Sequence, residues 1–77
     1  MRSFEIFDVN RPIMERNPII GGNSSRDALQ KYLNDRGENV KFKRSSDFNC
    51  RFQVTPVIYK NEKYYRAGRC CWYAIIN

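Results

Sequence analysis

Short runs in which apolar and polar side chains alternate make up most of the chain, and one segment has the wider apolar spacing of a helix. Residues 3–9 are of the first kind. Phe4 and Ile6 share one side of an extended backbone there, and Glu5 lies on the other. This pattern predicts a β-strand near the start of the sequence.

The clearest local signals indicate a helix from about residue 24 to residue 36. Ser24 and Asp27 form an S-x-x-D pattern, in which the serine caps the first turn and the carboxylate lies at the positive end of the helix dipole. One apolar stripe follows, made of Ala28, Leu29, Tyr32 and Leu33. Gly37 supplies the left-handed residue that ends a helix. We expect this helix to pack one face on a sheet.

Residues 10–23 connect the first strand to the helix without a regular pattern. Pro12 and Pro18 force extended backbone on the residues before them, and Gly21-Gly22-Asn23 is a turn signal. Four side chains in this stretch are too apolar to leave in water: Ile13, Met14, Ile19 and Ile20. We expect a segment held over the core by its isoleucines, with a binding loop as the alternative.

Strand-like alternation returns after the helix. Residues 40–43 and 51–55 both alternate with a period of two, and a polar stretch separates them. We expect the two segments to pair as a hairpin. If its phenylalanines face the helix, the opposite face carries Lys41, Lys43, Arg51 and Gln53.

A second hairpin is expected around Asn61-Glu62, which separates residues 57–60 from residues 63–67. Glutamate is an unfavourable choice at a turn position that requires positive φ. A two-residue turn would create two cross-strand pairs, Tyr59 with Tyr64 and Lys60 with Lys63. The last apolar run, residues 70–76, is expected to form a further strand.

Together these elements predict a single α+β domain spanning residues 1–77. One helix would pack on a mostly antiparallel sheet of four to five strands, and a curled or barrel-like sheet is an open alternative. The element order does not follow that of a double-stranded RNA-binding domain, and the motifs of the RRM and KH families are absent.

Charge changes this picture, because the net charge of +6 resides entirely in the second half. Residues 1–39 hold six basic and six acidic side chains, whereas residues 40–77 hold eight basic and two acidic ones. Eight of the eleven aromatic residues lie in the same basic half. A basic region interleaved with aromatics is typical of a surface that binds a polyanion.

The first hypothesis is therefore a small non-enzymatic module that binds RNA or another single strand. Tyr59 or Tyr64 would stack on bases. Seven cations would contact phosphates: Lys41, Lys43, Arg44, Arg51, Lys60, Lys63 and Arg66. Packing of the tyrosine pair within the sheet is the alternative interpretation.

A weaker anion-binding candidate is the start of the helix, at Ser24, Ser25 and Arg26. Backbone N–H groups at a helix N-terminus can bind phosphate, and the arginine would add charge. The P-loop frame and its lysine are absent, and ordinary capping explains the same residues.

The second hypothesis is a protein-interaction module. Residues 70–76 are apolar on both faces, which suits a central strand or an interface, and the loop 13–20 is rich in isoleucine. An acidic protein or a second copy of the chain would be the partner, so a homodimer is one form of this hypothesis.

Other classes of function are disfavoured. The chain has no histidine, which removes the commonest general base and zinc ligand, so we expect no enzyme, metal site or cofactor. Three cysteines without C-x-x-C spacing are expected to be reduced, with pairing of Cys50 to Cys70 or Cys71 left open. Without a visible signal peptide or membrane-spanning run, the expected location is the cytoplasm, away from membranes.

Overall fold

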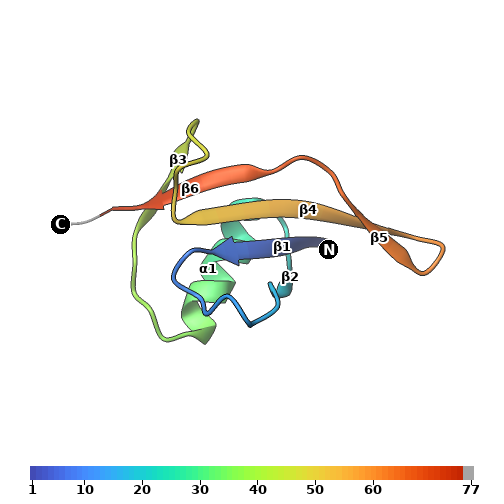
Figure 1. The fold of residues 1–77 in the computed structure, drawn as a ribbon, viewed down its shortest axis with the longest axis horizontal. Coiled ribbons are helices and arrows are strands. Elements are labelled where there is room, and N and C mark those ends of the chain that lie inside the picture. The colour runs from blue at the N-terminus through green and yellow to red at the C-terminus, as the bar shows by residue number, and fades with distance from the viewer. Residues whose placement is uncertain (76–77) are drawn as a thin grey trace.

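The computed structural model describes residues 1–75, which form one helix and an antiparallel sheet of six strands (Figure 1). In chain order the elements are β1 (Arg2–Asp8), β2 (Ile19–Gly22), α1 (Ser25–Asp35), β3 (Phe42–Ser45), β4 (Phe52–Lys60), β5 (Lys63–Arg66) and β6 (Cys70–Ala74). The α+β class is confirmed. The number of strands exceeds the expected four to five, and the sheet is open, with β2 and β3 at its edges.

The long strand β4 organises the sheet. Along one side it pairs with β1, from Phe52 opposite Asp8 to Val57 opposite Ser3. Along the other side it pairs with β6 through its first residues and with β5 through its last ones. Residues 67–69 join β5 to β6 as a bulge, because these three residues lie opposite only two residues of β4, 55 and 56. Gly68 in this bulge has a φ of +78°.

Helix α1 covers one face of the sheet and closes the hydrophobic core there. Its apolar stripe is buried as expected and meets inward side chains of β1, β4 and β6. The side chains with the least exposure are Phe4, Ile6, Leu29, Leu33, Phe52 and Val54. The opposite face of the sheet, described below, has no helix over it among residues 1–75.

The expected ends of the helix are confirmed by their hydrogen bonds. The Ser24 hydroxyl oxygen accepts from the backbone N–H of Asp27 at 3.1 Å, and the Asp27 carboxylate accepts from the backbone N–H of Asn23 at 2.9 Å. At the other end, Gly37 adopts a φ of +69°. These are the contacts of a capped helix, so local sequence was sufficient to define it.

The expected hairpin between residues 40–43 and 51–55 is wrong. β3 pairs with one side of β6 and β4 pairs with the other side, so β3 and β4 are not hydrogen-bonded to each other. Ser45 and Gln53 both oppose Cys71, which means that the polar stretch between them crosses over β6. Alternation identifies a strand but not its partner, and a polar connection can cross one strand instead of turning back.

The connection from β1 to the helix also differs from expectation. Its last residues form the edge strand β2, which pairs with β1 from Ile19 opposite Glu5 to Gly22 opposite Arg2. Ile20 packs against the core, whereas Ile13 and Met14 are 97% and 92% exposed. The prediction that isoleucines hold this segment over the core is therefore correct only for Ile20.

The hairpin around Asn61-Glu62 is confirmed, with both turn residues at positive φ of 53° and 66°. Its residues 58–65, which we call the arm, extend beyond the rest of the sheet and give the molecule its long dimension of 44 Å (Figure 1). Every residue of the arm is exposed. The last strand ends at Ala74, and Ile76, which the sequence placed in it, lies outside the described residues.

Candidate nucleic-acid interface

The sheet face away from α1, here called the uncovered face, collects exposed aromatic side chains. Strand alternation and register place on it Glu5 and Phe7 of β1, Gln53, Thr55 and Tyr59 of β4, Tyr64 and Arg66 of β5, Tyr73 of β6 and Lys43 of β3. The loop that crosses β6 adds Phe48. Five of these residues are aromatic and 39–61% exposed: Phe7, Phe48, Tyr59, Tyr64 and Tyr73.

The predicted tyrosine pair exists. Tyr59 and Tyr64 are cross-strand partners in the arm, with ring centroids 6.0 Å apart and planes tilted by 55°. The Arg66 guanidinium carbon lies 5.4 Å from the centre of the Tyr64 ring. Neither ring is packed in the core, so the pair presents aromatic surface to solvent at the outer end of the uncovered face.

Arg66 is tied to the body of the sheet by a carboxylate. Its guanidinium donates to both oxygens of Glu5, and the Asn17 amide donates to the same carboxylate at 3.4 Å. The hydrogen bond from Arg66 outweighs the effect of burial and lowers the pKa of Glu5, so the acid is ionised at neutral pH. Arg66 therefore brings hydrogen-bond donors to the face but no uncompensated charge.

Arg69 and Phe48 form a second cationic and aromatic pair, which the sequence did not indicate. The Arg69 guanidinium carbon lies 4.5 Å from the centre of the Phe48 ring, and its NH1 donates to the Gln53 side-chain oxygen at 3.0 Å. Within residues 1–75 it has no ion pair. Both residues line a hollow on the uncovered face with Thr55, Arg66 and Gly68. Each lies in a loop, where no periodic pattern assigns a face.

The structure divides the seven predicted phosphate-contacting cations among several surfaces. Lys43 lies opposite Tyr73 on the uncovered face, and Lys41 is exposed just before β3. Arg44 lies on the helix side of β3, with its guanidinium carbon 5.2 Å from the Trp72 ring centre. Lys60 and Lys63 are opposite each other near the tip of the arm, on the side away from Tyr59 and Tyr64.

Arg51 differs most from expectation, because it belongs to a structural network and not to an outward-facing surface. Its Nε donates to Asp8 at 3.1 Å and one terminal nitrogen donates to Glu38 at 2.9 Å. The Tyr32 hydroxyl donates to the other Asp8 oxygen at 2.8 Å. Burial alone would raise the pKa of Asp8. The hydrogen bonds from Arg51, the Asn10 backbone and Tyr32 together have the larger effect, so the pKa lies below its usual value.

Capping contacts engage part of the start of the helix. The Ser24 hydroxyl accepts from the backbone N–H of Asp27, the Asp27 carboxylate accepts from that of Asn23, and Lys31 lies 3.4 Å from the same carboxylate. Ser25 begins the helix, and Arg26 lies over the ring of Phe42, with 5.1 Å between the guanidinium carbon and the ring centre. The three predicted residues thus do not converge on one point.

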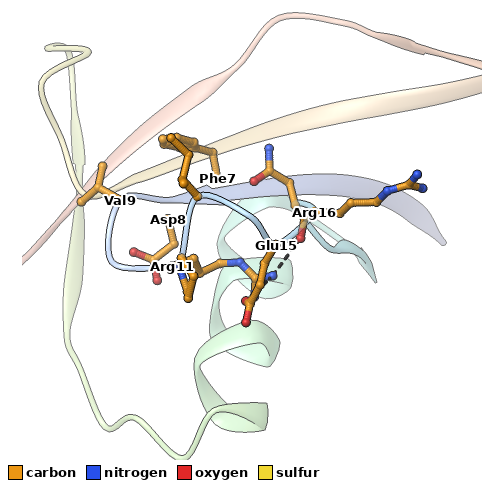
Figure 2. Close-up of a pocket in the computed structure, with 9 residues that line it drawn as sticks. Phe7, Asp8, Val9, Arg11, Glu15 and Arg16 are labelled. Carbon is orange, nitrogen blue, oxygen red and sulfur yellow. Dashed lines mark hydrogen bonds and ion pairs between the residues drawn. The ribbon is translucent and has the colours of Figure 1, made fainter.

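A separate cavity of about 470 Å³ lies beneath the loop after β1 (Figure 2). Phe7, Val9 and Ile13 form part of its lining, and Arg11 extends toward Glu15, with 3.0 Å between guanidinium and carboxylate. Arg11 also donates to the Arg16 carbonyl at 2.8 Å. These bonds hold the loop closed on itself and leave its apolar side chains exposed.

The cysteines are free thiols in the structure. Burial and a hydrogen bond with the Cys50 thiol raise the pKa of Cys71, which makes it a poor nucleophile.

Residues 1–75 contain no group of three or more cysteine or acidic side chains placed to hold a metal ion. In the same range, α1 lacks the length and apolar character that crossing a bilayer would need.

Comparison of the chain with protein-family models, curated proteins and solved structures found no match. The geometry of the uncovered face is therefore what indicates a function. Of the nine residues predicted from sequence, four lie there by strand register, namely Lys43, Tyr59, Tyr64 and Arg66. The structure adds four others, Phe7, Phe48, Arg69 and Tyr73, and keeps Gln53 on this face as the sequence predicted.

Proposed function

We propose that the chain is a non-enzymatic module that binds single-stranded nucleic acid across the uncovered face of its sheet. The observation that carries this proposal is the group of five exposed aromatic side chains interspersed with cations on one face that has no helix over it. Single-strand binders combine sheet aromatics, on which bases stack, with basic groups that follow the backbone.

The exposure of the aromatic side chains supports base stacking. A small domain normally buries its aromatics, yet Phe48 is 61% and Tyr59 is 59% exposed. Stacking of a base on such a ring contributes about 1–3 kcal/mol, which would offset the lost freedom of a flexible strand. The rings extend from Tyr73 in β6 to Tyr59 and Tyr64 in the arm, so a strand would follow the long direction of the sheet.

The charges on this face support a phosphate backbone as the other half of the ligand. Lys43 and Arg69 have no ion pair among the described residues, and the carboxylate of Glu5 is already neutralised by Arg66. Binding should therefore weaken as salt rises, because each cation that meets a phosphate releases a counterion.

A duplex fits this surface poorly. The uncovered face spans β1, β3, β4, β5 and β6, whereas the major groove of DNA usually accepts a helix or a two-stranded ribbon. The exposed side of α1 mixes charges, with Lys31 paired to Asp27 and Asp35 nearby, and the aromatic rings of the sheet would find no unstacked bases in a duplex. We therefore expect a preference for single strands.

The decisive experiment removes the tyrosine pair and measures the anisotropy of a labelled single-stranded oligonucleotide. Replacing Tyr59 and Tyr64 by alanine should weaken binding at least about tenfold, from the loss of stacking. The matched control replaces Ile58 and Tyr65, which form the cross-strand pair on the opposite side of the arm and are 56% and 55% exposed. Equal losses in both variants, or no binding at low salt, would contradict the proposal.

A second measurement distinguishes a cation of the uncovered face from a cation on the other side of the arm. Arg69→Gln should lower the salt dependence of log affinity by about one unit, because one phosphate contact is lost. Lys63→Gln, on the other side of the arm, should leave that slope unchanged. A slope that responds to Lys63 but not to Arg69 would move the interface away from the uncovered face.

Self-association is the second candidate function, and the loop after β1 is the observation that favours it. Val9 and Ile13 line the cavity of Figure 2 and are exposed, as is Met14 next to Ile13 in the chain. Apolar groups gathered in this way often mark an interface. Native mass measurement over a concentration series tests it. Dimers that disappear in an Ile13→Ser, Met14→Ser variant would support this candidate, and a monomer throughout would remove it.

A further inference from the structure

Two arginines from different elements cover one indole ring on the helix side of the sheet. The guanidinium carbon of Arg26, in the first turn of α1, lies 5.9 Å from the centre of the Trp72 ring. That of Arg44, in the edge strand β3, lies 5.2 Å from the same point. Phe42 meets Trp72 edge to face, with ring centres 5.4 Å apart, and completes an aromatic floor.

Neither arginine has a carboxylate partner within the described residues. Asp27, next to Arg26 in sequence, is committed to the backbone N–H of Asn23 and to Lys31. Two like charges near one ring repel each other, and contact with an aromatic face offsets only about 0.5–1 kcal/mol at an exposed site. An anion between them would remove that repulsion.

The ring beneath the arginines has an unsatisfied donor. Trp72 is 3% exposed, and its indole nitrogen is buried without an acceptor among residues 1–75. Buried polar groups are nearly always hydrogen-bonded, so an unpaired donor at such a place calls for an explanation. It is an observation separate from the two charges and located on the same side chain.

We propose that a phosphate group binds between the guanidinium groups of Arg26 and Arg44, over the floor formed by Phe42 and Trp72. The planar donor arrays of arginine match phosphate oxygens, and the nearby N-terminus of α1 favours negative charge. The site is on the opposite side of the sheet from the uncovered face and does not depend on the proposed function. A small phosphate ester and a nucleic-acid backbone both supply this group, and the experiment below distinguishes them.

The single tryptophan of the chain is a built-in reporter of this site. Inorganic phosphate, and separately a short oligonucleotide, would be titrated at constant ionic strength while the Trp72 emission is recorded. We expect a saturable change in the wild type and at least about tenfold weaker binding in Arg26→Gln and Arg44→Gln. Arg2→Gln is the matched control, since Arg2 is also exposed and lies 5.2 Å from the centre of an aromatic ring, that of Phe4.

The outcomes separate the two sources of phosphate and the two proposals. A response to inorganic phosphate identifies a site for small phosphate compounds, and a response to the oligonucleotide alone identifies a backbone site. Either response should survive replacement of Tyr59 and Tyr64 by alanine. No saturable response to either probe, or an equal effect of Arg2→Gln, would overturn the proposal. If a glutamine variant folds poorly, Arg44→Lys takes its place. It keeps the positive charge and should bind phosphate with an affinity between those of the wild type and of a variant without the charge.

Discussion

At the scale of single residues, Asp8 shows how the fold uses a charge that the sequence left unassigned. Its side chain has no exposed surface, yet it accepts hydrogen bonds from Arg51, Tyr32 and the Asn10 backbone. Those bonds connect the end of β1 to α1 and to the start of β4. Arg51 is paired within this network, although the sequence predicted it to contact phosphate.

Asp8→Asn should therefore destabilise the protein by about 3 kcal/mol at neutral pH, because Arg51 would lose a buried partner. Since the fold lowers the pKa of Asp8, its contribution is present above the ordinary value of 3.8 and is lost as pH falls through the lowered value. Urea unfolding of both proteins over acidic pH should show the difference shrinking.

Glu38→Gln is the control for this prediction. Its side chain is 29% exposed, so its ion pair with Arg51 should contribute about 1 kcal/mol or less. A constant difference between wild type and Asp8→Asn at every pH would show that the Asp8 charge is not what stabilises the fold.

At the scale of elements, local signals were sufficient where the element is itself local. The capped helix and the two-residue hairpin turn follow from neighbouring residues, and the turn alone predicted that Tyr59 would meet Tyr64. The pairing of β3 with β6 could not be predicted, because no pattern within residues 42–45 distinguishes one strand partner from another. Asp8 and Arg51 are 43 residues apart, so their contact has no local signature either.

The hairpin turn supplies a prediction at this scale. Glu62 adopts a φ of 66°, a conformation that costs a residue with a side chain about 1 kcal/mol relative to glycine. Glu62→Gly should therefore stabilise the arm, and its amide protons should exchange about fivefold more slowly. Glu62→Ala retains the Cβ atom and should give no such protection. Similar protection in both variants would exclude backbone strain as the cause.

At the scale of the whole molecule, the arm and the body differ in how much of their surface is buried. The core lies between α1 and the sheet, whereas all residues of the arm are exposed. Binding would therefore depend on a part of the chain that contributes little to folding. This separation is typical of functional segments, which tend to have low local stability.

Replacing residues 59–64 by Asn-Gly tests this separation. The shorter hairpin keeps Ile58 opposite Tyr65 and uses a favourable turn. We expect the free energy of unfolding to change by less than about 1 kcal/mol and single-strand affinity to fall at least about tenfold. Thermal unfolding and oligonucleotide anisotropy would measure the two effects. Unfolding of the body would contradict the separation.

The bulge at residues 67–69 has a consequence for how this chain can change by insertion or deletion. Odd-numbered residues of β6, such as Tyr73, share the uncovered face with even-numbered residues of β5, such as Tyr64. The one supernumerary residue produces that switch of parity. Loss of one codon at Gly68 would remove that residue and leave a regular ladder, in which Arg66 still opposes Val57 and Cys70 still opposes Val54, so Tyr64 and Tyr73 would keep their face. The connection can therefore lose one residue without moving either tyrosine off the uncovered face.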